Sequence, residues 1–186
     1  PYGQLRYDGL PVAPIGEGSD HVVRMRSTSK VLAPGLRVGW TEGPRWLVDA
    51  MVIAKQSADL HTSTLSQAIV TELLGDAAWF ADHVASIRYQ YGLRRDALCD
   101  ALTAVLGDRI SFQRPEGGMF LWATLPEVET MPLLSTALEE GVAFVPADAF
   151  TIDVDRAHTA RLSFATVDPE DFATAVERLA AAIDAC

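Results

Sequence analysis

Strand-like and helix-like segments alternate along this chain, and the alternation limits the folds that it can adopt. Short runs rich in apolar and β-branched residues indicate strands, whereas stretches with apolar residues at helical spacing indicate helices. The longest helical pattern covers residues 76–106. Alternation of this kind predicts an α/β or α+β architecture. The expected strands cover residues 21–27, 36–41, 110–113, 119–123, 142–145 and 161–165.

Several helix ends can be placed from residues that favour them. Pro44 suits the first position of a helix that follows the second strand. Gly92 interrupts the long helical pattern, and Gly107 ends it. Asp168 is followed by proline and two acidic residues, a combination that predicts the start of the last helix.

Composition excludes several classes of protein. Apolar residues make up 49% of the 186 residues, which is too large a share for a disordered chain. The net charge of −10 argues against general binding to nucleic acid or to an anionic membrane. No apolar run reaches the roughly 18 residues that a membrane-spanning helix needs. The two cysteines are too few for a disulfide framework, so a reducing cytoplasm is the expected location.

The segment Ser-Thr-Ser-Lys-Val-Leu-Ala-Pro-Gly-Leu-Arg, residues 27–37, carries the most chemical information. It lies in residues 1–45, where six Lys or Arg stand against four Asp or Glu, a balance of +2. A lysine that loses its proton readily can form a Schiff base with an aldehyde. Hydroxyls and a guanidinium can hold a phosphate, and the Pro-Gly turn, where glycine permits a close backbone approach, would fold Arg37 back toward Lys30. These groups suit a phosphorylated aldehyde such as pyridoxal phosphate.

The segment STSKVLAPGLRVGW, residues 27–40, closely resembles the cofactor-lysine motif of the fold-type I pyridoxal-phosphate enzymes. This superfamily includes the class I/II aminotransferases, and the motif is most similar to that of the 2-aminoadipate-type members. The resemblance extends over most of the chain, but it corresponds only to the C-terminal half of such proteins. Further segments that resemble family motifs, in the same order, are PYGQLRYDG (1–9), DLHTSTLSQ (59–67), RPEGGMFLW (114–122), VAFVP (142–146) and ARLSFA (160–165).

The resemblance implies roles for five residues at a cofactor site. Lys30 would be the Schiff-base lysine and the catalytic proton carrier. Arg37 would bind the cofactor phosphate, with Ser27 and Ser29 as hydroxyl partners. Tyr2 would donate a hydrogen bond to the ring oxygen of pyridoxal phosphate. The ordinary alternatives are a solvated lysine, a surface arginine and an unstructured chain start.

The resemblance also implies a substrate residue and two departures from the family pattern. Arg161 would bind the substrate's α-carboxylate through a bidentate pair, although a structural ion pair is the alternative. Gly117 and Gly118 would lie near the mouth of the site. Ala147 replaces the usual glycine after the VAFVP segment, and Thr28 replaces the usual aromatic residue between the two serines.

The fold implied by the resemblance is fold type I: the C-terminal part of the large cofactor domain in residues 1–75 and the α+β small domain in residues 76–186. The chain starts only one residue before Tyr2, so it would lack the upstream aspartate that keeps the cofactor's ring nitrogen protonated. We therefore expect a piece of a longer protein that needs the upstream half of the fold.

The function that the resemblance implies is transamination between an amino acid and a 2-oxo acid by a cytoplasmic homodimer. Two alternatives remain at this point. The first is a lyase, decarboxylase or racemase of the same fold. The second is an aminotransferase-like sensor domain of a transcription regulator, the only case that would involve nucleic acid. The chain alone is expected to be aggregation-prone or dimeric, and inactive.

Overall fold

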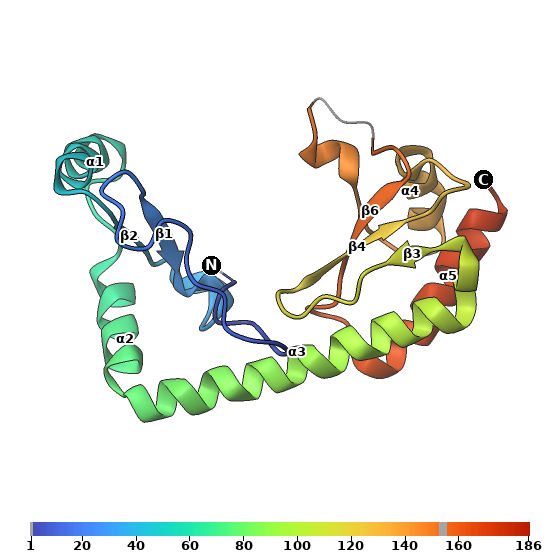
Figure 1. Cartoon of the computed structure of the whole chain (residues 1–186), viewed down its shortest axis with the longest axis horizontal. Helices are drawn as coiled ribbons and strands as arrows, with labels where there is room; N and C mark the ends of the chain where they lie inside the picture. The colour runs from blue at the N-terminus through green and yellow to red at the C-terminus, as the bar shows by residue number, and fades with distance from the viewer. Residues whose placement is uncertain (1, 153–155) are drawn as a thin grey trace. The chain divides into compact units, whose positions relative to one another are not determined.

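The predicted alternation of strands and helices is confirmed by a computed structural model, which describes residues 2–152 and 156–186 (Figure 1). Among these residues no helix has the length and apolar character needed to cross a membrane. The strands are β1 (Arg24–Ser27), β2 (Gly39–Glu42), β3 (Ser111–Phe112), β4 (Phe120–Thr124), β5 (Val145–Pro146) and β6 (Thr159–Ser163). The α-helices are α1 (Arg45–Ala58), α2 (Thr64–Gly75), α3 (Ala77–Leu106), α4 (Thr130–Glu139) and α5 (Phe172–Asp184).

The chain divides into two compact units, Pro1–Arg88 and Tyr89–Cys186, called here the N-terminal unit and the C-terminal unit. Helix α3 begins in the first unit and ends in the second. Gly92 does not interrupt α3, contrary to expectation, because one glycine costs a helix only about 0.5–1 kcal/mol and the flanking residues continue the helix. Gly107, at φ +51°, follows its last residue as predicted. The domain boundary predicted between residues 75 and 76 stays a prediction.

The N-terminal unit is built on an antiparallel pair of strands. In the register of β1 with β2, Arg24 faces Glu42 and Ser27 faces Gly39. A Cβ atom at Gly39 would lie 2.8 Å from the carbonyl oxygen of Arg26, so only glycine permits this pairing. Helix α1 then begins directly after Pro44, as predicted.

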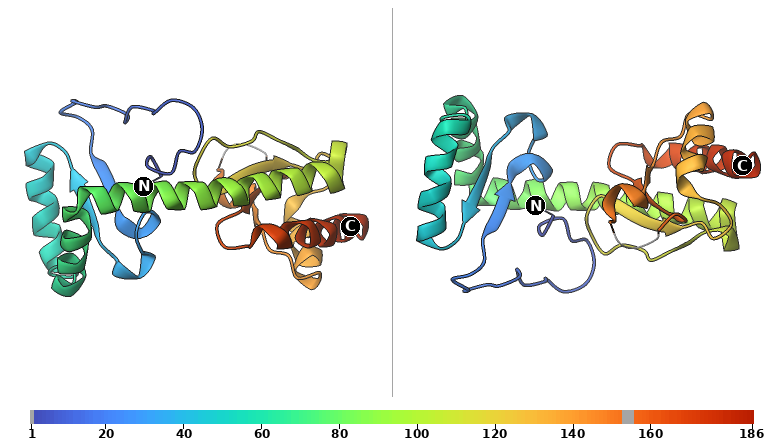
Figure 2. Two further views of the ribbon diagram at one scale, coloured as in Figure 1. Left: turned by 90° about the horizontal axis from the view of Figure 1, so that it is seen from below. Right: turned by 90° about the horizontal axis from the view of Figure 1, so that it is seen from above.

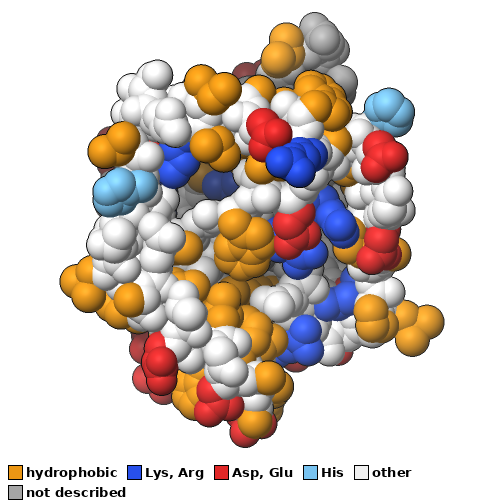
Figure 3. Space-filling model, turned by 90° about the vertical axis from the view of Figure 1, so that its left-hand side faces the viewer, with side chains coloured by type: hydrophobic (Ala, Val, Ile, Leu, Met, Phe, Trp, Pro, Cys, Tyr) orange, Lys and Arg blue, Asp and Glu red, His pale blue; other side chains and the backbone are white. Residues whose placement is uncertain are grey.

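The N-terminal unit has little core of its own. Its buried apolar side chains, among the described residues, are Leu5, Val31, Val38, Val70 and Val84. Helix α1 buries no residue at all, although its sequence is rich in apolar side chains. Figure 3 shows hydrophobic side chains exposed on the face that carries α1 and α2. The large exposed apolar side chains of these helices are Trp46, Met51, Val52, Ile53, Leu65 and Ile69.

The C-terminal unit is a four-stranded antiparallel sheet with the order β3-β4-β6-β5. Helices α4 and α5 pack against each other on one side of it (Figures 1 and 2). On β6, Ala160 and Leu162 are buried and alternate with three less buried residues, as the period of a strand requires. Other large buried apolar side chains of this unit include Leu102, Leu121, Leu125, Leu133, Phe164, Phe172 and Val176.

Some strand boundaries differ from those predicted, for local reasons. Residues Pro34–Leu36 form a 3-10 helix (η2), and Arg37 has the left-handed φ of +55°, so β2 starts only at Gly39. Strand β6 starts two residues earlier than expected because its pairing with β4 extends to Thr159. The last helical segment does begin after Asp168, as a short 3-10 helix (η5, Pro169–Asp171) that leads into α5.

Candidate active site

The lysine segment lies in the connection between β1 and β2. Residues Thr28–Lys30 form a 3-10 turn (η1), which begins where the side chain of Ser27 accepts a hydrogen bond from the amide of Ser29 at 3.1 Å. The Ser27 hydroxyl in turn donates to the Ser29 hydroxyl oxygen at 2.9 Å. Because serine oxygens favour turn starts, the sequence Ser-Thr-Ser-Lys forms this turn locally. The two predicted hydroxyl partners are therefore side by side, next to Lys30.

Thr28 anchors this turn to the opposite strand. Its side chain is fully buried, and its hydroxyl donates to the carbonyl oxygen of Val38 at 3.0 Å. The amide of Thr28 donates to the same oxygen at 3.1 Å. The Val38 oxygen thus accepts two hydrogen bonds, one of which satisfies the buried hydroxyl of Thr28. The departure from the family pattern at position 28 thus has a structural role that the sequence did not reveal.

Lys30 ends the turn and is half-buried. Its Nζ atom lies 5.8 Å from the centre of the Tyr2 ring, a distance at which a cation and an aromatic face attract each other. Tyr2 is held near the start of the chain by a turn in which the amide of Leu5 donates to the Tyr2 carbonyl oxygen. The structure thus brings Tyr2 and Lys30 together.

Arg37 follows the Pro-Gly turn and is exposed. Its guanidinium donates to the carbonyl oxygen of Pro34 at 3.2 Å, which curls the side chain over its own turn. The turn itself packs against the lysine turn. A Cβ atom at Gly35 would meet no atom within 4 Å, so contacts with the described residues do not require a glycine there. The close approach lies at Gly39 instead.

His83 supports the lysine segment from α3. Its Nε2 atom lies 2.9 Å from the carbonyl oxygen of Val31, the residue after Lys30. The imidazole ring stacks on Trp79, one turn earlier on the same helix, with ring centres 5.0 Å apart. No role for His83 was predicted, and the only available signal was the helical spacing of Trp79 and His83.

Three charged side chains, those of Arg24, Arg26 and Glu42, lie together on the β1–β2 strand pair. Glu42 accepts a hydrogen bond from the indole nitrogen of Trp40 at 3.0 Å, and Arg26 lies 3.1 Å away. The hydrogen bond from Trp40, followed by the charges of Arg26 and Arg24, holds the pKa of the Glu42 carboxyl below its ordinary value of 4.5. Glu42 therefore stays ionised and neutralises part of the positive charge of β1.

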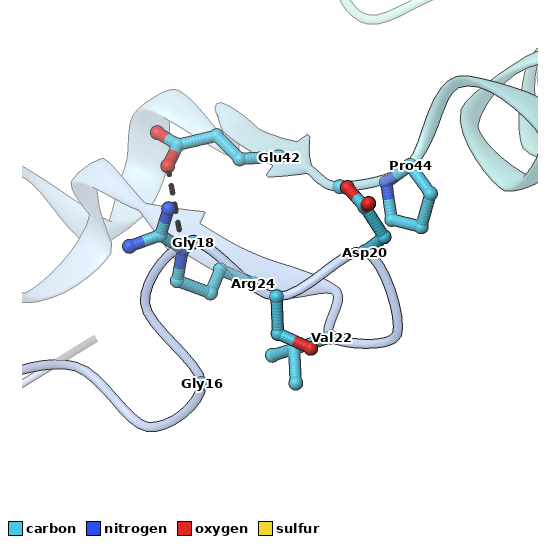
Figure 4. Close-up of a pocket in the computed structure, with 9 residues that line it drawn as sticks. Gly16, Gly18, Asp20, Val22, Arg24, Glu42 and Pro44 are labelled. Carbon is cyan, nitrogen blue, oxygen red and sulfur yellow. Dashed lines mark ion pairs between the residues drawn. The ribbon is translucent and has the colours of Figure 1, made fainter.

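Two hollows open in the N-terminal unit near this strand pair. The smaller has a volume of about 240 Å³, and Figure 4 shows Arg24 reaching across it to Glu42, at 3.8 Å. The larger has a volume of about 800 Å³ and is lined by apolar side chains of residues 12–15 and by Met25, Ser27 and Trp40. Neither of these two hollows is lined by Lys30 or Arg37.

Arg161 lies on β6 in the C-terminal unit, between Trp122 of β4 and Val145 of β5. Two aromatic rings lie close to its guanidinium. Its Cζ atom lies 4.1 Å from the centre of the Phe120 ring and 4.4 Å from that of Phe150, which follows β5 in the 3-10 helix η4 (Ala147–Phe150). Both contacts are within the range of strong cation–π attraction.

The surroundings of Arg161 fit a carboxylate. Its Nε atom is buried and has no hydrogen-bond partner among the described residues. Nor does any described carboxylate lie within ion-pair distance of the Arg161 guanidinium. With two aromatic rings close to the guanidinium, its N–H groups are what can bind an anion, and their fork matches a carboxylate. The alternative of a structural ion pair gains no support from these residues.

The remaining predicted positions lie around the same sheet. Gly118, at φ +85°, occupies a conformation that favours glycine in the loop that precedes Phe120. Gly117 lies next to it, half-buried. Ala147 is fully buried at the start of η4, so its methyl group fills space in the core.

The chain is similar to known proteins along nearly its whole length. The model of the family "Aminotransferase class I and II" matches residues 2–179. The aromatic-amino-acid aminotransferase 1 of Thermococcus litoralis is 41% identical over 186 residues, which cover 98% of this chain and 44% of that protein. The 2-aminoadipate transaminase of Thermus thermophilus is 38% identical over 98% of this chain and 46% of its own length.

A solved structure agrees with these relatives. The α-aminoadipate aminotransferase of Thermus thermophilus, in complex with N-(5'-phosphopyridoxyl)-L-leucine, superimposes with a TM-score of 0.91 at 36% identity. The match covers 99% of this chain and 48% of that one. The chain thus spans about half the length of its relatives, and the fold class predicted from the sequence is confirmed.

Proposed function

Because the chain belongs to the class I and II aminotransferase family, we propose that it supplies half of a pyridoxal-phosphate site for transamination. The complete protein would move an amino group from an amino acid to a 2-oxo acid. The observation that carries the proposal is the turn at Lys30, which is held by Thr28 and flanked by the hydroxyls of Ser27 and Ser29.

The residues of the N-terminal unit fit the cofactor. A half-buried amine, two hydroxyls and an arginine lie between the end of β1 and the start of β2, and the centre of the Tyr2 ring lies 5.8 Å from the amine. In this proposal Lys30 binds the aldehyde carbon covalently. Ser27, Ser29 and Arg37 hold the phosphate, and the Tyr2 hydroxyl donates a hydrogen bond to the ring oxygen.

When bound, pyridoxal phosphate supplies an electron sink for the bond broken at the substrate's α-carbon. Lys30 would take the α-proton as a base and return it as an acid, because a lysine amine can hold a proton between the two transfers. Arg161 binds the substrate by its carboxylate, and the rings of Phe120 and Phe150 lie close to the guanidinium.

An upstream half of the fold and a second subunit are also part of the proposal. The relatives are about twice as long as this chain. Val12, Ile15 and Met25, which line the larger hollow of the N-terminal unit, are 74%, 89% and 71% exposed and need a cover. In this proposal the upstream half of the protein covers this hollow, and a second copy of the protein packs against the apolar face of α1. The cytoplasmic location stays a prediction from composition.

The assay that tests the proposal combines the complete protein with 2-oxoglutarate and a panel of amino donors. Aromatic amino acids and 2-aminoadipate come first, because aminotransferases for these are the relatives described above. Residues 1–186 alone, assayed in parallel, should be inactive and dimeric or aggregated. Turnover by a soluble monomer of residues 1–186 would overturn this division of the site.

The same assay separates the two alternatives. A lyase or decarboxylase would consume the amino acid without any 2-oxo acid, and release of ammonia or carbon dioxide would show it. A sensor domain of a regulator would bind amino acids without turnover. Both are less well supported than transamination, because the two relatives and the solved structure described above are aminotransferases.

A further inference from the structure

The loop that leads into β4, residues 113–119, has little support from the sheet. Strand β3 pairs with β4 only at Ser111 with Thr124 and at Phe112 with Ala123. At its other end, β4 begins at Phe120, which pairs with Ser163 of β6. The β3–β4 ladder therefore stops before the loop, in which Gly117 makes an isolated β-bridge, and side-chain contacts add to the support of the loop.

Arg95 of α3 provides the first of these contacts. It is 5% exposed, and its Nη1 atom donates to the carbonyl oxygen of Pro115 in the loop at 2.9 Å. Its Nε and Nη2 atoms each lie 2.8 Å from the Oδ1 atom of Asp96. A buried arginine needs its partners, so the carbonyl of Pro115 is held firmly.

Arg114 provides the second contact, in the opposite direction. From the loop, its Nη1 atom donates to Asp96 and its Nη2 atom to Asp100, both at 2.6 Å. Asp96 and Asp100 are one turn apart on α3, so a single guanidinium bridges both. The hydrogen bond to Asp100 is also the main cause that raises the pKa of Arg114 above its ordinary value. We call Arg95, Asp96, Asp100 and Arg114 the arginine clamp.

The clamped loop ends at a residue that touches the candidate site. Phe120 follows the loop directly, and its ring centre lies 4.1 Å from the Cζ atom of Arg161. Just before it, the Met119 carbonyl oxygen accepts a hydrogen bond from the amide of Phe164. A shift of the loop would thus move the ring that orients Arg161.

We propose that Arg95 and Arg114 are positioning residues for substrate binding, because they fix the loop that places Phe120 against Arg161. The inference rests on the proposed function for the role of Arg161. Exposed ion pairs contribute little to stability one at a time. The clamp differs because one arginine is buried and both arginines share a carboxylate, so its effect is a local one on the loop.

The test compares variants in the complete protein with pyridoxal phosphate bound. Arg114→Gln removes the two hydrogen bonds from Arg114 to Asp96 and Asp100. Arg95→Lys keeps the positive charge but loses the several N–H donors of the guanidinium. Arg109→Gln is the matched control, because Arg109 forms a similar 2.8 Å pair with Asp184 that does not touch the loop. Amide hydrogen exchange of residues 113–120 and steady-state kinetics are measured for each.

We expect exchange in residues 113–120 to become about tenfold faster or more in Arg114→Gln, because both charge-assisted hydrogen bonds of Arg114 are lost. The KM for the amino donor should rise several-fold while kcat stays within about twofold, since the loop affects binding and not the proton transfer. Arg114→Lys should partly restore both, and Arg109→Gln should change neither.

Two outcomes would overturn the inference. Unchanged exchange in the loop of Arg114→Gln would show that the clamp does not hold it, whatever the activity of the protein. Faster exchange with an unchanged KM would show a purely structural clamp. If the unmutated protein has no transaminase activity, the proposed function fails instead, while the exchange result still decides whether the clamp exists.

Discussion

Replacement of Arg161 by lysine tests how the C-terminal unit binds substrate. The Cζ atom of Arg161 lies 4.1 and 4.4 Å from the ring centres of Phe120 and Phe150, and the N–H groups of its guanidinium are what can bind a carboxylate. Lysine keeps the positive charge but can offer a carboxylate only a point contact in place of the fork. One charge-assisted hydrogen bond is worth about 1.5–3 kcal/mol.

At about 1.4 kcal/mol for each factor of ten, this loss corresponds to a KM about 10 to 150 times higher for the amino donor. The absorbance of bound pyridoxal phosphate should not change, because the proposed cofactor ligands all lie in the N-terminal unit. Steady-state kinetics over a range of donor concentrations, with an absorption spectrum of each variant, measure both quantities.

Arg109→Lys is the control for Arg161→Lys, since Arg109 lies in the same unit and pairs with Asp184 at the surface. Its KM should equal that of the unmutated protein. A thermal melt checks that Arg161→Lys is folded. If the folded Arg161→Lys variant kept the original KM, the substrate's carboxylate would bind elsewhere. Arg161 would then have only a structural role beside Phe120 and Phe150.

Three further predictions concern single groups. Thr28→Val should lower the free energy of unfolding by about 1 kcal/mol, because the hydrogen bond from the Thr28 hydroxyl to the Val38 oxygen is lost while the one from the Thr28 backbone N–H remains. Thr28→Ser keeps the hydroxyl and is the control. Equal melting temperatures of the two variants would contradict the role of the hydroxyl. The pKa of Glu42 is lowered by folding, so the ionised carboxylate should stabilise the folded state at pH values above 4.5, its ordinary pKa. This stabilisation should be lost as the pH falls through the lowered pKa. Glu42→Gln should therefore be less stable than the unmutated protein at neutral pH but not in acid, and a difference in stability that persists in acid would refute the prediction. Cys99 is 1% exposed and burial raises its pKa, whereas Cys186 is exposed. A thiol reagent should therefore label Cys186 first, which peptide mass mapping would show. Equal labelling of both cysteines in the folded protein would contradict the burial of Cys99.

Much of the fold could be predicted because its signals are local. The helix after Pro44, the end of α3 at Gly107 and the segment after Asp168 follow from capping and breaking residues within a few positions. The candidate cofactor residues could also be named, because Lys30 and its neighbours stand together in one segment of the sequence. Gly92 shows the limit of such reasoning, since the continuity of α3 depends on its whole length.

The supporting residues could not be predicted, because they act across long separations in the sequence. His83 lies 52 residues from Val31, and Arg114 lies 18 and 14 residues from Asp96 and Asp100. Each pair meets only after α3 has folded beside a strand connection. Their residue types alone are compatible with solvated surface positions, so only the structure reveals the contacts.

The covalent attachment of pyridoxal phosphate to Lys30 is the claim on which the account depends most. Borohydride reduction of the complete protein with its cofactor converts the link to a stable amine, and peptide mass mapping locates it. The account predicts a pyridoxyl group on Lys30 and none on Lys55, the other lysine of this chain, which pairs with Asp59 on the surface at 2.8 Å. A label on Lys55, or no label on this chain at all, would contradict it.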